Sequence, residues 1–388
     1  MINEIKTLLL KNIDTVGNGS IIASPTKENP NYFYHWIRDG AIVMNSLIDL
    51  YEMDQLSFNE LVKYFTNYIN YEENLLYLDS VCHRGEPKFN VDMTSFDEHW
   101  GRPQNDGPAL RTLTLIKYSY ILIEKNIFNK KLYDGTFPSK SIIKNDLEYI
   151  CQTYKNKSFD IWEEICDYSY FTLLVQYKAL FEGSKFAFRH NDIRGGTKYL
   201  KTAKYLKLFL DMFKNNQIQT HLTDQRKESN LDSSIIIGHV LVDDVYNIHL
   251  LKTIIKIIKQ NKTKYDINNK LKYPLIGRYH YDHYYGGNPW ILTTVYFVIC
   301  LKKFADHHYY INQEFEYLLN KLIVALNYTS DKTHIKDILN DIITDYTQML
   351  FDIGQDIEWA EQIDRNDMSG VSAKYLTWNF ASFISLLK

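Results

Sequence analysis

The segment Ile335–Leu350, IKDILNDIITDYTQML, indicates how this chain folds. Its apolar residues recur at steps of three and four positions, which is the repeat of an α-helix. This repeat places one apolar stripe along one face, so the segment is predicted to pack by a single side. The stripe consists of Ile335, Ile338, Leu339, Ile342, Ile343, Tyr346, Met349 and Leu350.

A second type of helix is predicted upstream. Residues 290–301 are apolar nearly all round, with Asn288 placed as the N-cap and Pro289 at the first helical position. Such a helix is expected to be buried on most sides. Similar helical patterns occur at Ile37–Leu50, Leu56–Ile69, Leu110–Ile123, Tyr168–Phe181 and Thr377–Leu387.

About twelve or thirteen helical segments follow one another along the chain, and alternating apolar and polar runs are few. This pattern predicts an all-α fold. The mixture of one-sided and fully apolar helices suggests two concentric layers. Neither a linker nor an internal repeat divides the sequence, so residues 1–388 are expected to form a single domain.

Composition limits the possible functions. The 388 residues are 45% hydrophobic and carry a net charge of −3, which suits a large core and gives no global field to attract nucleic acid. The N-terminal sequence MINEIKTLLLKN interrupts its apolar run with charges, so neither a signal peptide nor a membrane span is predicted. Four widely spaced cysteines without CxxC spacing predict free thiols. We expect a cytoplasmic monomer.

Two other patterns admit more than one interpretation. Lys252, Lys256 and Lys259 lie among isoleucines and fit either a membrane-surface helix or an outer helix of the fold. The second is favoured because amphipathic stripes usually face a core. His280 and His283 flank an aspartate like metal ligands, but the sequence offers no partner motif such as HExxH. No metal or other cofactor is predicted.

The stretch Gly85–Arg111, GEPKFNVDMTSFDEHWGRPQNDGPALR, has the composition of a binding loop. Trp100 beside Gly101 offers a flat apolar face, and charged residues of both signs are available to hold hydroxyl groups, a combination that suits a sugar ring. A solvated linker would explain the glycines and prolines, but neither the tryptophan nor the charge density. The charged residues are Glu86, Lys88, Asp92, Arg102 and Asp106.

At this stretch the chain resembles the glucoamylases, inverting exo-acting glycoside hydrolases that release glucose from the non-reducing ends of starch and glycogen. Four further blocks agree in the same order: GSIIASPTKENPNYFYHWIRD (19–39), DIWEEICDYSYFTLLVQYKALFEG (160–183), GRYHYDHYYGGNPW (277–290), and EQIDRND followed by LTWNFA (361–381). The resemblance implies an (α/α)6 barrel of six inner and six outer helices, with the site at one end. It covers essentially the whole chain and leaves no room in it for a starch-binding module.

The resemblance also implies roles for individual residues. Inverting hydrolysis needs a protonated carboxyl for the leaving oxygen and a carboxylate on the opposite ring face to activate water. Glu163 matches the catalytic acid, whereas Glu164 either contacts substrate or simply begins the following helix. Substrate contacts are implied for Tyr32, Trp36, Arg38, Asp39, Trp100, Gly101, Arg102, Trp162, Glu164, Arg278, Asp282 and Trp290.

The expected base differs from the family pattern. The resemblance places the base glutamate between the EQ-x-D-x-x-D and LTW stretches, and an ungapped count back from Leu376 places Ser369 there. A serine hydroxyl loses its proton far above neutral pH and cannot serve as this base. Asp367, two residues earlier, is the nearest substitute.

Three functional readings follow. The chain is predicted to be an exo-acting α-glucosidase with a displaced base, using glycogen, starch or maltodextrins, or else an inactive glucan-binding or regulatory protein of the same fold. A third reading, another (α/α)6 enzyme such as a prenyltransferase subunit, lacks the zinc ligand set that such an enzyme needs.

Overall fold

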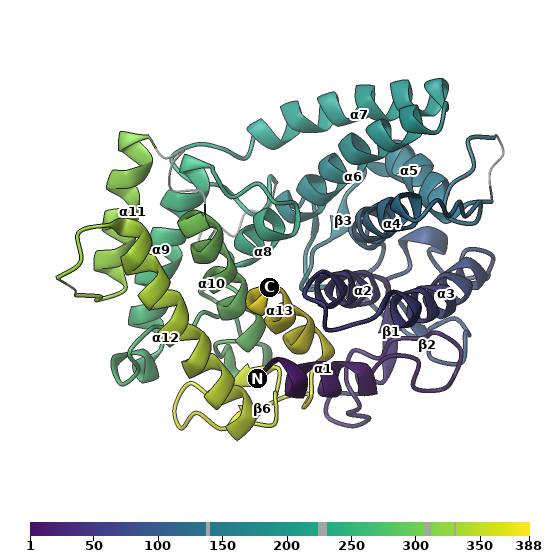
Figure 1. Ribbon diagram of the computed structural model, residues 1–388. Helices are drawn as coiled ribbons and strands as arrows, with labels where there is room; N and C mark the ends of the chain where they lie inside the picture. The colour runs from purple at the N-terminus through teal and green to yellow at the C-terminus, as the bar shows by residue number, and fades with distance from the viewer. Residues whose placement is uncertain (137–139, 224–230, 307–311, 330) are drawn as a thin grey trace.

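The computed structural model describes residues 1–136, 140–223, 231–306, 312–329 and 331–388 and is mostly helical (Figure 1). The helices are α1 (Ile2–Lys11), α2 (Ile37–Glu52), α3 (Phe58–Leu75), α4 (Gly107–Glu124), α5 (Ile142–Thr153), α6 (Tyr170–Arg189), α7 (Ile193–Asp211), α8 (Ser234–Leu241), α9 (Ile248–Lys264), α10 (Ile291–Asp306), α11 (Gln313–Ala325), α12 (Ile335–Asp356) and α13 (Thr377–Leu387).

Short strands form three antiparallel pairs within the described residues. β1 (Tyr34–Trp36) pairs with β2 (Lys88–Asn90), β3 (Ser158–Phe159) with β4 (Cys166–Asp167), and β5 (Gln362–Ile363) with β6 (Gly370–Val371).

Six helices form a closed inner ring. Along the chain α2 contacts α4, α4 contacts α6, α6 contacts α8 and α8 contacts α10; α10 then contacts α13, which returns to α2. Helices α1, α3, α5, α7, α9 and α12 lie outside this ring, each packed on an inner helix, and α11 packs on α9 (Figure 1). This arrangement confirms the predicted (α/α)6 barrel.

Apolar patterning decides which layer a helix joins. Every side chain of α10 from Ile291 to Leu301 is buried, because neighbours surround this inner helix. The outer helix α12 buries one stripe, including Leu339, Ile342, Tyr346 and Leu350. In α9 the isoleucines between positions 254 and 258 are buried and Lys256 and Lys259 are exposed, which confirms the outer-helix interpretation of this segment.

The start of α10 differs from the prediction. The helix begins at Ile291, because Pro289 and Trp290 form isolated β-bridges instead of a first helical turn. Asn288 therefore does not act as an N-cap; its side-chain amide donates to the carbonyl oxygen of Tyr285 (2.8 Å). An extended approach to α10 thus replaces the predicted capped turn.

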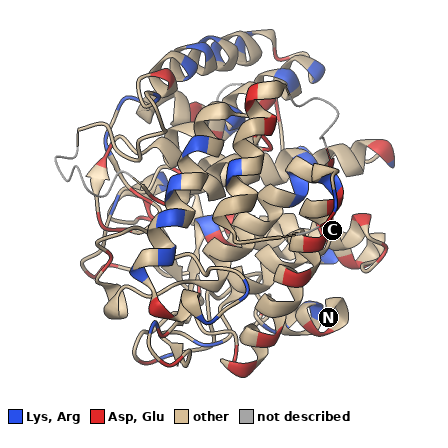
Figure 2. Ribbon diagram, turned by 90° about the vertical axis from the view of Figure 1, so that its left-hand side faces the viewer, with Lys and Arg blue, Asp and Glu red and all other residues tan. Residues whose placement is uncertain are grey.

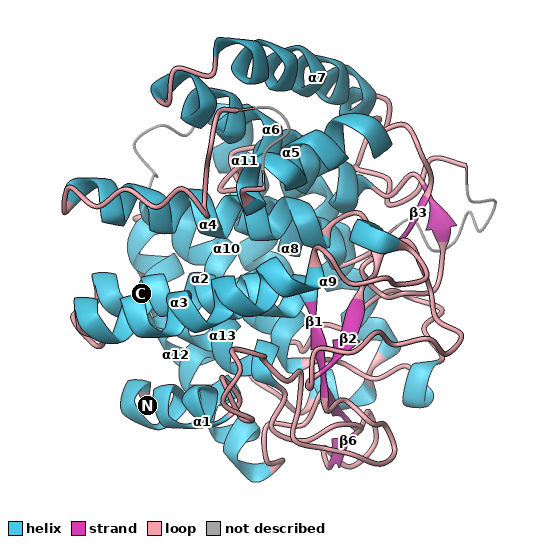
Figure 3. Cartoon of the chain, turned by 90° about the vertical axis from the view of Figure 1, so that its right-hand side faces the viewer, coloured by secondary structure: helices cyan, strands magenta, loops and turns pink. Residues whose placement is uncertain are grey.

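Strands and long loops gather at one end of the barrel (Figure 3). Inner helices begin at this end: β1 runs directly into α2, the β3–β4 pair precedes α6, and the β5–β6 pair precedes α13. Helix N-termini carry partial positive charge, so this end of the barrel favours carboxylate side chains and polar ligands.

The surface carries charges of both signs, with basic residues following the outer side of α7 at the top of the molecule (Figure 2). Among the helices described, none combines the length and apolar character needed to cross a membrane. Cys82, Cys151, Cys166 and Cys300 are free thiols, as predicted.

Candidate active site

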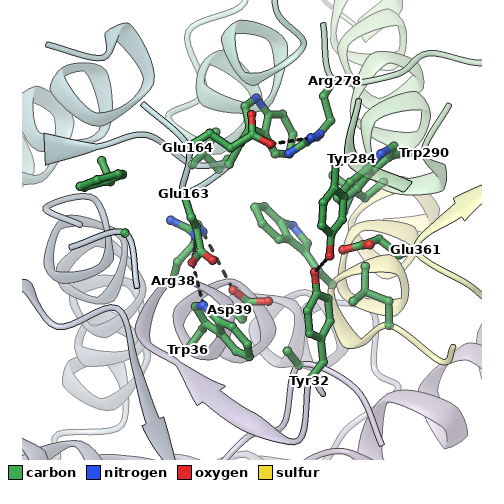
Figure 4. Close-up of a pocket in the computed structure, with 18 of the residues that line it drawn as sticks. Tyr32, Trp36, Arg38, Asp39, Glu163, Glu164, Arg278, Tyr284, Trp290 and Glu361 are labelled. Carbon is green, nitrogen blue, oxygen red and sulfur yellow. Dashed lines mark hydrogen bonds and ion pairs between the residues drawn. The ribbon is translucent and has the colours of Figure 1, made fainter. Parts of the chain in front are cut away.

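A cavity of about 570 Å³ lies at the strand-bearing end of the barrel (Figure 4). Its wall combines aromatic rings with ionisable side chains, a composition that suits a ligand with both apolar faces and hydroxyl groups. The lining residues are Ala23, Tyr32, Trp36, Arg38, Asp39, His99, Trp100, Gly101, Phe159, Ile161, Trp162, Glu163, Glu164, Arg278, Tyr284, Trp290, Leu292, Glu361, Leu376 and Trp378.

Glu163 lies between β3 and β4 with its carboxylate surrounded by donors. Trp36 Nε1 donates to Oε1 and Trp100 Nε1 donates to Oε2, both at 2.8 Å. Gln104 Nε2 (3.0 Å) and Arg38 Nη2 (3.3 Å) also donate to Oε1. The backbone φ of Glu163 is 66°, a left-handed value that is uncommon outside glycine and is found at functional sites. Neither Glu163 nor Glu164 begins a helix.

Gly101 lets the Trp100 segment pass directly against the Glu163 backbone. A Cβ atom at this position would lie 2.6 Å from the carbonyl oxygen of Glu163 and 2.8 Å from the ring of Phe159. Backbone and ring cannot both yield, so this contact requires glycine.

The first turn of α2 supplies Arg38 and Asp39. Arg38 Nη1 donates to Asp106 Oδ2 (2.6 Å), while its Nε lies 4.0 Å from Asp39 Oδ2. Burial raises the pKa of Asp39 to about 7, although the Arg38 guanidinium opposes the shift. Arg38 Nε is buried without a hydrogen-bond partner among the described residues, so it is available to a ligand.

Arg278 forms another wall of the cavity. Asp282 accepts hydrogen bonds from its Nε (2.8 Å) and Nη2 (2.6 Å), and Glu164 Oε1 accepts one from Nη2 (2.8 Å). Its guanidinium carbon lies 5.1–5.3 Å from four ring centroids, which favours stacking of the planar cation. The rings are those of Trp162, Tyr279, Tyr284 and Trp290.

A further carboxylate, Glu361, faces the cavity from the side opposite Glu163 (Figure 4). Ser372 Oγ donates to Glu361 Oε2 (2.5 Å), and the Tyr32 hydroxyl is a second hydrogen-bond partner. Burial raises the pKa of Glu361 to about 7, against the effect of these hydrogen bonds and of the Arg278 charge.

The position expected for the base, Ser369, does not line the cavity. Because β5 and β6 pair Ile363 with Gly370, Ser369 and Asp367 fall in the exposed turn between the strands, where the Ser369 amide donates to Asp367 Oδ1 (2.8 Å). The carboxylate of this region that lines the cavity is Glu361, which precedes the hairpin. Neither Ser369, the predicted base position, nor Asp367, the predicted substitute, lines the cavity, whereas Glu361 does.

The charged residues of the Gly85–Arg111 loop were expected to hold hydroxyl groups, yet none of the five lines the cavity. Arg102 Nε donates to Glu86 Oε1 (2.8 Å), and Asp106 pairs with Arg38. These two ion pairs tie the loop to itself and to α2. Asp282 likewise lies behind Arg278 and does not line the cavity.

The structure brings most of the remaining predicted residues together. Those that line the cavity are Tyr32, Trp36, Arg38, Asp39, Trp100, Gly101, Trp162, Glu163, Glu164, Arg278 and Trp290. Sequence reasoning missed Glu361, Tyr284 and Trp378, although each belongs to a block that resembles the family. Their position inside these blocks was the sequence feature that could have identified them as cavity residues.

The whole chain, residues 1–388, matches the family model described as "Glycosyl hydrolases family 15". The glucoamylase GLA1 of Saccharomycopsis fibuligera is 32% identical, with 95% of this chain and 84% of that protein covered. A probable glucoamylase of Schizosaccharomyces pombe is 31% identical, with coverages of 96% and 85%.

Solved structures show the same likeness. A glucoamylase from Saccharomycopsis fibuligera aligns with a TM-score of 0.85 and 27% identity, covering 100% of this chain and 94% of that one. A family 15 glucoamylase from Hypocrea jecorina aligns with a TM-score of 0.86 and 27% identity, with coverages of 99% and 70%. Sequence, fold and cavity therefore agree that this chain belongs to glycosyl hydrolase family 15.

Proposed function

We propose that this protein is an inverting, exo-acting α-glucosidase that releases glucose from the non-reducing ends of glycogen, starch or maltodextrins. The observation that carries the proposal is the pair Glu163 and Glu361, two carboxyl groups facing one cavity from opposite sides. The relatives named as glucoamylases, at 32% and 31% identity, support the substrate class.

In this mechanism Glu163 donates its proton to the glycosidic oxygen as the bond to the anomeric carbon breaks. Glu361 accepts a proton from a water molecule on the opposite face of the sugar ring, and the water oxygen forms the new bond to that carbon. Glucose leaves with the β configuration. Tyr32, a hydrogen-bond partner of Glu361, orients the water.

The cavity wall supplies the substrate contacts. Arg38 Nε and Trp290 Nε1 are buried without hydrogen-bond partners among the described residues, and hydroxyl groups of a bound glucose unit would satisfy them. Asp39 accepts from further hydroxyls, and the aromatic rings pack on the apolar faces of the sugar.

The test compares glutamate-to-glutamine variants on maltotriose. Glu163→Gln and Glu361→Gln are each expected to lower kcat by about 10²–10⁴-fold, the usual contribution of a positioned acid or base. Glu358→Gln, at an exposed glutamate three positions before Glu361, should leave the rate unchanged. Initial α-glucose, detected by proton NMR, or full activity of either variant would overturn the mechanism.

Azide separates the two carboxyl roles. Glu361→Ala should leave space for azide, which attacks the anomeric carbon of α-glucosyl fluoride, expels fluoride and forms β-glucosyl azide without needing deprotonation. Wild-type protein should give no azide product, because Glu361 fills that space. Azide rescue of Ser369→Ala, with none for Glu361→Ala, would return the base to the exposed turn.

The alternative of an inactive glucan-binding protein rested on the missing carboxylate. No observation in the cavity now favours that alternative over hydrolysis. Glucose release from maltotriose by the wild-type chain is the measurement that decides between them.

A further inference from the structure

Lys88, the first residue of β2, is buried beside the cavity without lining it. Only 1% of its surface is exposed. Its ammonium lies 3.2 Å from the ring centroid of Trp100, 3.9 Å from that of Phe96, 4.6 Å from that of Tyr34 and 4.7 Å from that of Trp36. Among the described residues no carboxylate forms an ion pair with Lys88. The buried ammonium is thus surrounded by the rings of Tyr34, Trp36, Phe96 and Trp100, which we call the aromatic cage.

The two indole rings of this cage are the ones that hold Glu163. Trp36 is the cross-strand partner of Lys88 in the β1–β2 pair, and its Nε1 donates to Glu163 Oε1. Trp100, the ring nearest the ammonium, donates from Nε1 to the other carboxylate oxygen. The face of each indole therefore meets the cation while its N–H edge meets the carboxylate.

We infer that Lys88 is a positioning residue for the proton transfer by Glu163: its charge, acting across Trp36 and Trp100, stabilises the carboxylate that forms when the proton leaves. A cation over an indole face also orients the ring and strengthens its N–H as a donor. The inference rests on the proposed role of Glu163 as the acid.

Other charges near this pair already have partners. Arg38 is held by Asp106 and Asp39 and also donates to Glu163 Oε1 (3.3 Å), so that Lys88 adds a second cation to a carboxylate that Arg38 already contacts. Arg102 is held by Glu86. Glu98 is exposed to solvent, which screens its charge. Glu163 is the acidic group with the largest electrostatic effect on Lys88, and burial lowers the pKa of Lys88 to about 8.

The first test is Lys88→Met, which keeps the length and apolar stem but removes the charge. Without the cation the carboxylate form of Glu163 is less favourable, so kcat on maltotriose should fall roughly tenfold and the alkaline limb of the pH profile should move up by about one pH unit. With α-glucosyl fluoride, whose leaving group needs little protonation, the rate should hardly change. Lys185→Met, at an exposed lysine over Phe181, is the matched control and should alter none of these values.

The outcomes separate this inference from the proposed function. If wild-type protein cleaves neither substrate, the proposed function fails. If it cleaves both, and Lys88→Met slows them equally or leaves the alkaline limb in place, the role of Lys88 is overturned while the function stands.

A measurement on the intact cage covers the case in which Lys88→Met does not fold. In ¹³C-lysine-labelled protein the Lys88 Cε signal should be shifted upfield by its four rings. Its titration midpoint should fall in Glu163→Gln, because the loss of the negative charge makes the ammonium less favourable. An unchanged midpoint would overturn the inference.

Discussion

Glu361 ties folding stability to pH through a single buried carboxyl group. Burial raises its pKa to about 7 in the folded protein from the ordinary 4.5. A raised folded-state pKa contributes stability that is complete below about pH 4.5 and is lost as pH rises through 7. Glu361→Gln removes this loss, so the variant should gain stability over wild type between pH 4.5 and 8, by on the order of 3 kcal/mol.

Urea unfolding of wild type and Glu361→Gln at pH 4.5 and at pH 8 measures this difference in the free energy of unfolding. Glu358→Gln, at the exposed glutamate of the same segment, should show no such gain. A Glu361→Gln variant whose stability relative to wild type is the same at pH 4.5 and pH 8 would contradict the burial argument.

At Gly101, the addition of a single Cβ atom is expected to lower activity. Gly101→Ala places a Cβ 2.6 Å from the Glu163 carbonyl oxygen, so either the loop or Glu163 must move. Because shifts of about 1 Å at an acid cost roughly 10²-fold in rate, kcat should fall by about that factor. Thr94→Ala, at an exposed position of the same loop, is the control. Equal rates for Gly101→Ala and Thr94→Ala would show that the contact between Gly101 and Glu163 does not affect catalysis.

At the scale of elements, the β5–β6 hairpin separates two serines that lie close together in the sequence. Ser372 donates to Glu361, whereas Ser369 lies in the exposed turn. Ser372→Ala removes a hydrogen bond that favours the charged carboxyl, so the pKa of Glu361 should rise further and hydrolysis should fall more at pH 6 than at pH 8.

Ser369→Ala and Ser369→Glu should both leave the maltotriose rate unchanged, because position 369 lies in an exposed turn and does not line the cavity. A gain in glucose release from Ser369→Glu would mean that this turn, and not Glu361, is where the base belongs.

At the scale of the whole molecule, a buried ion network joins the two layers. Arg111 of α4 binds Glu72 of α3 and donates to Asp146 of α5 at 2.7 and 2.8 Å, and all three side chains are buried. Arg111→Met leaves the buried Asp146 without its arginine and Glu72 paired only with His35 (3.1 Å), and should lower the free energy of unfolding by about 3–5 kcal/mol. Lys131→Met, which breaks an exposed pair with Glu73, should cost less than about 1 kcal/mol.

Thermal and urea unfolding of the two variants measure this contrast. Equal, small losses would show that water reaches the network and that the layers are held by apolar packing alone.

The sequence by itself determined the helices and their layers. The stripe of α12 and the all-round apolar character of α10 are local repeats, so they are readable without the fold. The resemblance blocks also located most of the cavity wall, including Glu163, Arg38 and Arg278.

Only the tertiary structure decided which groups share the cavity. Glu163 and Glu361 lie far apart in the sequence and meet because α13 closes the ring onto α2. The ungapped count along the sequence selected Ser369, and only the pairing of β5 with β6 shows that Ser369 lies in an exposed turn while Glu361 lines the cavity. Likewise Arg102 and Asp282 were indistinguishable by type from residues that face a ligand. The tertiary structure gives each a protein partner away from the cavity lining: Arg102 binds Glu86, and Asp282 binds the cavity residue Arg278.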